Sequence, residues 1–226
     1  MVANKGVFVV AAIITIVLLI SIYSFNLFLN TQRERAIIER MEQVLDEYQE
    51  LQALSLMSEV FGKEMTCISL EKRLAHMDKT LWDTGIKIDM YREATEKFIT
   101  DPFYLDQKKK FNRNEIIYLS MLENMKQWCT FNQTTILYFY KKKEDCAECD
   151  AQSFVLTDLN KDIDQEIAIF SFDSNLKLPS VDTLELFYGI DSFPCIVVEN
   201  KTYCGLHDKD ALIDLICEHD DISLCS

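Results

Sequence analysis

The sequence predicts an α/β protein in three parts: a transmembrane helix, an α-helical spacer and a C-terminal domain in which strands and helices alternate. Three observations predict this order. Residues 6–32 carry no charge, apolar residues recur at helical spacing from 34 to 128, and short apolar runs alternate with helical patterns after 131. We place the boundaries at 1–33, 34–130 and 131–226.

The charge of the chain changes at the second of these boundaries. The 226 residues carry a net charge of −14, and residues 131–226 contribute −12 of it with seven Lys, no Arg and 19 acidic residues. Such a break is typical of a domain boundary. The acidity excludes a general nucleic-acid binder, which needs a basic face to neutralise phosphates.

The first part is a membrane anchor. The run Val7–Leu29 is 23 residues of almost purely apolar sequence, and about 20 such residues in a helix span a bilayer. A cleaved signal peptide is the alternative, but its apolar core is shorter, about 7–15 residues, and ends at a small-x-small site that is missing here. We expect an uncleaved single-pass anchor.

Two signals disagree about the side of the membrane on which the rest of the chain lies. Arg33, Arg35 and Arg40 outnumber Lys5 and slightly favour a cytoplasmic C-terminal part. Eight cysteines favour an oxidising compartment, where pairs can close. We expect an extracytoplasmic C-terminal part.

The spacer contains three helical stretches. Apolar residues follow a helical stripe over 34–61, a second stretch ends at Asp101-Pro102, and a third runs from Phe111 to Trp128. The first stretch can continue the membrane helix as one rod. A small helical spacer is the simplest interpretation, and a homodimer through a coiled coil of the first stripe is the alternative. If the second and third helices are antiparallel neighbours, Cys67 and Cys129 meet, and we predict a disulfide between them.

The C-terminal domain is predicted to have the order β-α-β-α-β-β-α and a mixed sheet covered on both faces. The strands are four apolar or aromatic runs, and the helices are three segments with apolar positions on one side. In chain order the elements are Thr135–Tyr140, Ala147–Leu159, Ile167–Phe172, Val181–Tyr188, Cys195–Val198, Lys201–Cys204 and Lys209–Glu218.

A pair of cysteines with two residues between them, Cys146-Ala-Glu-Cys149, lies between the first strand and the first helix of this domain. A thiolate is the nucleophile of disulfide exchange, and the N-terminal end of a helix stabilises that anion. The spacing lets the second sulfur reach back to a mixed disulfide. We expect Cys146 to attack and Cys149 to resolve.

These features resemble the thioredoxin-like superfamily over residues 134–218. The strand ILYFY, the Cys146-x-x-Cys149 helix start, Phe193-Pro194 before a strand and Gly205 after the hairpin carry the resemblance. The resemblance implies that Pro194 is a cis-proline beside the disulfide and that Phe193, Cys195 and Gly205 line the same substrate groove. The anchor, spacer and thioredoxin-like domain together also resemble a class of archaeal membrane proteins.

The remaining cysteines have more than one interpretation. We expect Cys195 and Cys204 to be small buried apolar residues, with a second disulfide or a relay to Cys146–Cys149 as alternatives. Cys217 and Cys225 bracket the end of the last helix, and a disulfide between them would tie down the tail. A zinc site would need a second cysteine or histidine pair near the first, so we expect neither a metal nor a bound cofactor.

The sequence therefore predicts a membrane-tethered thiol–disulfide oxidoreductase. Its partners would be proteins with thiols or disulfides and a redox partner protein, because no nucleotide-binding signature is present to supply electrons. The alternative is a redox-inert thioredoxin-like module for binding or assembly, in which Cys146–Cys149 is a structural disulfide. The acidic residues around the pair, Glu144, Asp145 and Glu148 among them, favour that alternative because they disfavour a thiolate.

Overall fold

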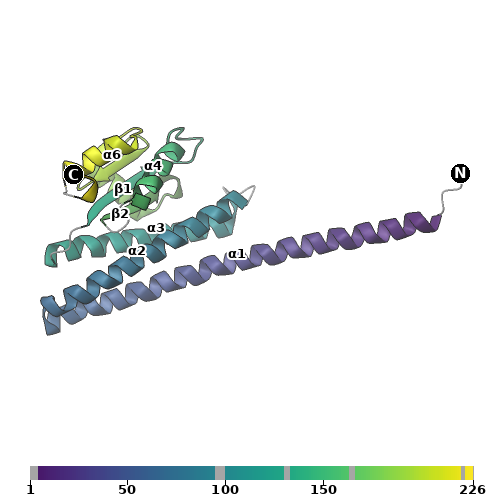
Figure 1. Ribbon diagram of the computed structural model, residues 1–226, viewed down its shortest axis with the longest axis horizontal. Coiled ribbons are helices and arrows are strands. Elements are labelled where there is room, and N and C mark those ends of the chain that lie inside the picture. The colour runs from purple at the N-terminus through teal and green to yellow at the C-terminus, as the bar shows by residue number, and fades with distance from the viewer. Residues whose placement is uncertain (1–4, 95–99, 130–132, 163–165, 220–221, 226) are drawn as a thin grey trace.

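The computed structural model describes residues 5–94, 100–129, 133–162, 166–219 and 222–225, and it shows a mixed α/β protein with a long N-terminal helix (Figure 1). Three helices precede a four-stranded sheet and its own helices. The elements are α1 (Lys5–Phe61), α2 (Lys63–Ala94), α3 (Pro102–Trp128), β1 (Thr134–Tyr140), α4 (Cys149–Asp162), β2 (Ile167–Asp173), α5 (Pro179–Tyr188), β3 (Cys195–Val198), β4 (Lys201–Cys204) and α6 (Lys209–Cys217).

The N-terminal half of α1 projects alone from the rest of the molecule (Figure 1). Its large apolar side chains from Val7 to Phe28 are all more than half exposed. Among the described residues this is one helix long and apolar enough to cross a membrane. The helix continues without a break into the spacer, as a single rod.

The C-terminal half of α1 packs against α2 and α3. Glu47 of α1 accepts a hydrogen bond of 3.1 Å from the Thr80 hydroxyl of α2, and the two helices run antiparallel. The apolar stripe of α1 is buried at four positions in these contacts: Ile37, Met41, Val44 and Leu51. These four positions of the stripe are thus covered within one chain, whereas Ile38, Leu45 and Met57 of the same stripe are exposed.

The helix α3 starts earlier than the sequence stripe indicates. Pro102 occupies its first turn, and the Asp101 carboxylate accepts a hydrogen bond of 2.9 Å from the Tyr104 amide. A proline in the first turn lacks an amide that would have no helical partner, and an aspartate before it caps the helix. Asp101-Pro102 therefore begins α3, whereas the sequence analysis treats this pair only as the end of the preceding helix.

The strands lie in the order β2-β1-β3-β4. The pair β1–β2 is parallel, while β1–β3 and β3–β4 are antiparallel. Alternate residues of β1 therefore point to opposite faces: Ile136 and Tyr138 pack under α4 and α6, and Leu137 and Phe139 face the other way. All four strands and three helices expected after residue 131 are present, and each begins within two residues of its expected start.

The second face of the sheet shares its core with the spacer. Leu122 and Tyr118 of α3 belong to one continuous cluster of buried side chains with Phe170 and Phe172 of β2. The Tyr118 and Phe170 rings lie 5.3 Å apart between centroids. The predicted division between residues 130 and 131 is therefore crossed by a common hydrophobic core.

Polar groups also join α3 to the sheet. Asn112 donates to the Ser171 carbonyl at 2.9 Å and accepts from the Asp173 amide at 3.1 Å. Glu115 accepts from the Ser171 amide at 2.8 Å and from the Asn112 side chain at 2.7 Å. Burial raises the pKa of Glu115 to about 8, against the opposing effects of these donors and of Lys108.

The raised pKa of Glu115 makes folding pH-dependent. The folded chain holds this proton up to about pH 8, whereas the unfolded chain releases it near 4.5. The protonated side chain therefore contributes stability below pH 4.5 that is lost as the pH rises to 8, on the order of 5 kcal/mol. In Glu115→Gln, which stays neutral, we expect the free energy of unfolding of the full chain in detergent to fall much less over this interval. Urea titrations followed by near-ultraviolet circular dichroism measure it.

Glu71→Gln, which changes an exposed carboxylate on α2, is the control and should keep the wild-type slope. Equal pH slopes for wild type and Glu115→Gln would contradict the prediction.

Candidate functional site

The candidate site is the disulfide between Cys146 and Cys149 at the junction of β1 and α4. The two Cα atoms are 5.5 Å apart. The helix begins at Cys149, two residues later than expected, so Cys146 lies in the preceding turn. The Lys141 amide, at the end of β1, points to the Cys149 sulfur at 3.5 Å, and the Tyr138 hydroxyl donates to the Cys149 carbonyl at 2.5 Å. The disulfide is thus fixed to the C-terminal end of β1.

The turn that carries Cys146 is held by Asn175, which follows β2. The Asn175 side chain accepts a hydrogen bond of 2.6 Å from the Lys142 amide and donates one of 2.8 Å to Asp145. The Asn175 amide in turn donates to the Asp173 carboxylate at 2.9 Å. Parallel pairing of β1 and β2 places the ends of both strands at one edge of the sheet, so these contacts form where the disulfide lies.

The segment before β3 comes to the same edge. Cys195 pairs with Phe139 across the antiparallel β1–β3 ladder, and the preceding Phe193–Pro194 peptide bond is cis. The Lys141 ammonium lies 4.2 Å from the centroid of the Phe193 ring, a cation–π contact. The structure thereby brings Phe193, Pro194 and Cys195 to the end of β1 that carries Cys149.

Gly205 belongs to the same constellation. Its amide donates to the Pro194 carbonyl at 2.8 Å, and its φ of 102° is a backbone conformation that glycine adopts without a steric penalty. Two residues later, the His207 amide donates to the Gln152 side chain of α4 at 2.7 Å, and Gln152 donates back to the His207 carbonyl. The loop after β4 is therefore tied both to Pro194 and to the helix that begins at Cys149.

Cys195 and Cys204 form a disulfide across the β3–β4 hairpin. The expectation of two unpaired apolar cysteines is wrong. The two residues lie directly opposite each other in the ladder, with Cα atoms 4.0 Å apart, and cross-strand neighbours at this spacing bring their side chains together. Cys195 is fully buried and Cys204 is exposed. The hairpin register could have revealed the pair, since the turn Glu199-Asn200 sets it.

The other four cysteines lie away from this edge. Cys67 is paired with Cys129, which joins the start of α2 to the end of α3. Cys217 is paired with Cys225, which joins the end of α6 to the C-terminal segment. Each Cα–Cα distance is close to 5.7 Å, and both pairs are those that the sequence analysis favours.

Buried ionisable groups lie at the ends of β1 and β2, next to the disulfide. Burial raises the pKa of the Asp173 carboxyl, and Lys108 opposes that shift. The Lys108 ammonium lies 5.7 Å from the centroid of the Tyr140 ring, and burial raises the pKa of Tyr140 above its ordinary range. Asp173 and Asn175 were not predicted as supports of the site. Their signal was an aspartate directly after a strand, where it caps the single turn Ser174–Leu176.

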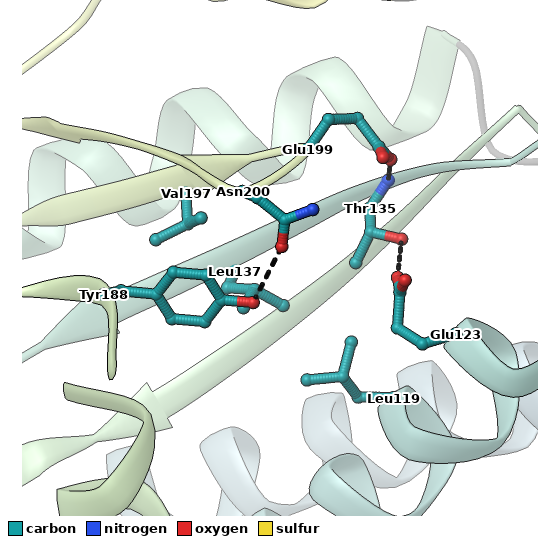
Figure 2. A pocket seen from close by; sticks show the side chains of 8 residues that line it. All are labelled: Leu119, Glu123, Thr135, Leu137, Tyr188, Val197, Glu199 and Asn200. Carbon is teal, nitrogen blue, oxygen red and sulfur yellow. Dashed lines mark hydrogen bonds between the residues drawn. The ribbon is translucent and has the colours of Figure 1, made fainter. Parts of the chain in front are cut away.

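A small pocket lies at the opposite end of the sheet (Figure 2). It is lined by Leu119, Glu123, Thr135, Leu137, Tyr188, Val197, Glu199 and Asn200. Thr135 is near the start of β1 and Lys141 follows its end, so the pocket and the disulfide are separated by about 20 Å of strand. We assign the pocket no part in the chemistry of the cysteines.

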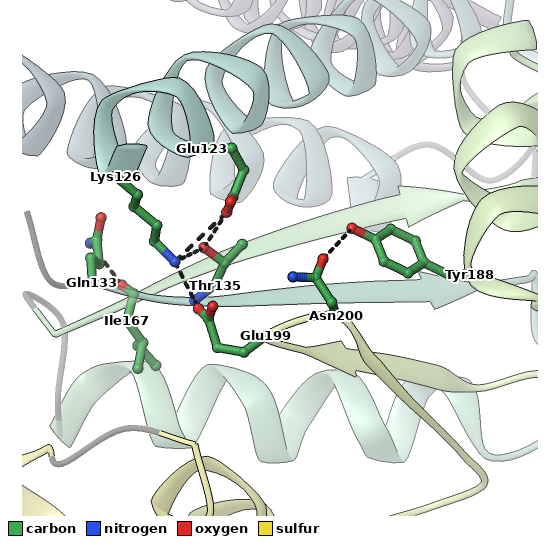
Figure 3. Close-up of polar contacts among 8 residues, drawn as sticks. All are labelled: Glu123, Lys126, Gln133, Thr135, Ile167, Tyr188, Glu199 and Asn200. Atoms are coloured by element: carbon green, nitrogen blue, oxygen red, sulfur yellow. Dashed lines mark hydrogen bonds and ion pairs between the residues drawn. The ribbon is translucent and has the colours of Figure 1, made fainter. Parts of the chain in front are cut away.

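The polar groups beside this pocket fasten the hairpin to α3 (Figure 3). Lys126 contacts the Glu199 carboxylate and the Thr135 hydroxyl, both at 2.7 Å. Glu199 also accepts from the Thr135 amide at 2.8 Å, and its φ of 41° belongs to the tight turn between β3 and β4. These contacts hold the far end of the sheet, so that both ends of β1 are fixed.

No family model and no curated protein matches the sequence. One similar solved structure is described as that of a malarial protein, with 24% identity and a TM-score of 0.34, and the match covers 39% of this chain and 98% of that one. Another is described as thioredoxin-2, a component of malaria parasite protein secretion machinery, with 26% identity, a TM-score of 0.34, and coverage of 39% and 84%.

Both neighbours are described as malarial proteins and one of them as a thioredoxin, and a TM-score of 0.34 is too low to carry an argument about this chain. Neither is archaeal, and the resemblance to archaeal membrane proteins is unsupported.

The role of Asn175 in holding the turn is testable. Asn175→Ala leaves the partly exposed Lys142 amide without its acceptor, and the loss of such a hydrogen bond costs about 0.5–1.5 kcal/mol. We expect hydrogen exchange at the Lys142 amide of the full chain to accelerate by up to about tenfold. Exchange mass spectrometry or NMR measures it.

The Gln152 amide, bonded to the Glu148 carbonyl at 3.0 Å within the start of α4, is the internal control and should keep its rate. An unchanged rate at Lys142 would show that Asn175 does not hold the turn.

Proposed function

We propose that the chain is a membrane-tethered thiol–disulfide oxidoreductase that acts on protein thiols or disulfides, with residues 131–226 as a thioredoxin-like domain. One observation carries the proposal. The Cys146–Cys149 disulfide and the Phe193–Pro194 segment lie together at one edge of the sheet, joined through Lys141. A redox pair beside an extended segment that can pair with a visiting peptide is an arrangement suited to disulfide exchange.

The proposed reaction starts from the reduced pair. The Cys146 thiolate attacks one sulfur of a substrate disulfide, the substrate S–S bond breaks, and the released sulfur takes a proton. The Cys149 thiolate then attacks the Cys146 sulfur, which releases the second substrate thiol and leaves the disulfide that the structure contains. Two electrons pass to the substrate. The reverse sequence oxidises a substrate dithiol, and a dithiol or disulfide of a redox partner protein restores the starting state.

The surroundings assign roles to the other residues of this edge. The partly exposed Phe193 and Gly205 would line the groove that receives the substrate backbone, while Pro194 and Cys195 are buried behind it and hold it in place. The amides in the first turn of α4 point toward the turn that carries Cys146 and favour its thiolate. Cys149 is held by the Lys141 amide and by Tyr138, so it is positioned to resolve the mixed disulfide.

The membrane tether is the segment Val7–Leu29 of α1, and we place the C-terminal part outside the cytoplasm. Four disulfides support this side, because all eight cysteines of the chain are paired. Disulfides persist in oxidising compartments and are rare in the cytosol.

A second candidate function is a redox-inert binding or assembly module. The burial of the pair favours it, since Cys146 is 6% exposed and Cys149 is 2% exposed. In that case the disulfide would only stabilise the start of α4. Exchange with a peptide would then require the turn around Cys146 to open.

The two functions are separated by insulin reduction with the full chain in detergent and dithiothreitol as the source of electrons. We expect the wild-type chain to accelerate reduction and Cys146→Ser to lower the rate to the background without protein, because the attacking sulfur is gone. The measurement is the turbidity of the reduced insulin B chain.

The matched control is the double variant Cys217→Ser/Cys225→Ser, which removes a disulfide at the far end of α6 and should keep the wild-type rate. A wild-type chain that does not exceed the background while its circular dichroism is native would favour the inert module.

A further inference from the structure

We infer that the Cys146–Cys149 edge of the sheet faces the membrane surface and that its partners are cysteine-bearing juxtamembrane segments of other membrane proteins. This inference rests on the proposed function, because it names the partner class of the same site. It follows from the direction of each element relative to α1.

The helix α2 brings the chain back along α1 toward the proposed membrane anchor. Thr80 contacts Glu47 at 3.1 Å, and further along α2 the Tyr91 hydroxyl contacts Glu34 at 3.5 Å. The end of α2 therefore lies beside the beginning of the polar half of α1. The Tyr91 hydroxyl also contacts the Asp101 carboxylate at 3.2 Å, so α3 begins at the same level.

The helix α3 and the strand β1 run in opposite directions relative to the anchor. The helix α3 runs away from the anchor, parallel to α1, and Asn114 lies 4.0 Å from the Met41 sulfur. The strand β1 then runs back, since Thr135 near its start contacts Lys126 and Tyr140 at its end lies near Lys108. The C-terminal end of β1, and the disulfide fixed to it, therefore point back toward the anchor. Figure 1 shows this arrangement of α1, α2, α3 and the sheet.

The height of the site above the membrane follows from its level along α1. Lys108 precedes Asn114 by six residues, so it lies at the level of Arg35 in the parallel helix α1. The residues Asn30 to Arg35 separate this level from Leu29, the end of the apolar segment. At 1.5 Å per residue they raise the site by about 9 Å. The headgroup layer is about 5–7 Å thick, so the disulfide lies just outside it.

The short distance between the disulfide and the bilayer limits the size of a partner that can reach it. A folded domain of 100 residues has a radius of gyration of about 13 Å and does not fit within about 9 Å of the hydrocarbon edge, because the headgroups fill most of that height. An extended segment does, since neighbouring strands need only about 5 Å. The Phe193–Pro194 segment lies at the same edge, so a chain leaving the bilayer nearby would meet both the disulfide and the backbone that pairs with it.

The charge of the edge distinguishes a peptide from a lipid. Residues 141–150 contain three Lys and four acidic residues, whereas recognition of anionic lipid headgroups needs a cluster of basic residues. The segment that carries the disulfide therefore has no excess of basic residues, and we take the chemistry available there to be that of the sulfurs.

The test uses the full chain with Cys149→Ser in phosphatidylcholine vesicles, which leaves Cys146 as the thiol outside a disulfide. Single-span reporter peptides carry one cysteine as a mixed disulfide with thionitrobenzoate, either about 10 Å from the bilayer or about 40 Å away on a helical spacer. The Cys146 thiolate attacks the peptide sulfur, forms the Cys146–peptide disulfide and releases thionitrobenzoate, which is measured by absorbance. We expect the near reporter to react about tenfold faster or more, since only its cysteine has a high effective concentration at the site.

A matched control moves the site without changing it. Seven helix-forming residues inserted between Leu29 and Asn30 raise the sheet by about 10 Å and keep its orientation to about 20°. We expect this insertion to reduce the near-reporter rate and to shift the preference to a reporter whose cysteine lies about 20 Å from the bilayer.

Three other outcomes are informative. Equal rates for near and far reporters, with a water-soluble reporter also reacting, would overturn this inference and leave the oxidoreductase function standing. No release from any reporter, the soluble one included, would overturn the proposed function itself. A soluble reporter that reacts faster only when anionic lipid is added, with near and far reporters alike, would overturn the peptide partner in favour of a lipid.

Discussion

The packing of α3 between two helices and a sheet is the constraint on which the rest of the structure depends. One side of α3 contacts α1 and α2, and Tyr118 and Leu122 belong to the same buried cluster as β2. Asn112 and Glu115 add hydrogen bonds to the backbone of β2. Because α3 is common to both layers, the sheet and the disulfide at its edge have one position relative to α1.

Strand register then assembles the candidate site. Parallel pairing brings the end of β2, with Asp173 and Asn175, beside the end of β1, and antiparallel pairing brings Pro194 there from 50 residues further along the chain. A shift of one residue in either ladder would turn the buried side chains of a strand to the other face. The strand ends that form the site are therefore held by the same burial that holds the core, and the contacts of Asn175 hold the turn between them.

Much of this architecture could be predicted from local patterns. The seven elements after residue 131 follow from runs such as TILYFY and from helical spacing, and Cys146 and Cys149 were found because their spacing is itself a signal. Sequence patterns did not reveal what depends on distant contacts. Asn175 holds the turn before Cys146 through bonds across 33 and 30 residues. The Cys195–Cys204 bond is a different case, because it follows from the register of the predicted hairpin, and the expectation of two unpaired cysteines overlooked that register. The role of Asp101-Pro102 as a helix start was missed because the same pair also ends a helix.

The central claim is that Cys146–Cys149 is a reactive disulfide and the Cys67–Cys129 and Cys217–Cys225 disulfides are structural. The most direct measurement is graded reduction of the folded full chain in detergent, with thiols alkylated at each step and mapped by mass spectrometry. The account predicts that Cys146 and Cys149 are alkylated first, while those two structural disulfides and the near-ultraviolet circular dichroism persist. A Cys146–Cys149 bond that opens only when the chain unfolds would contradict it.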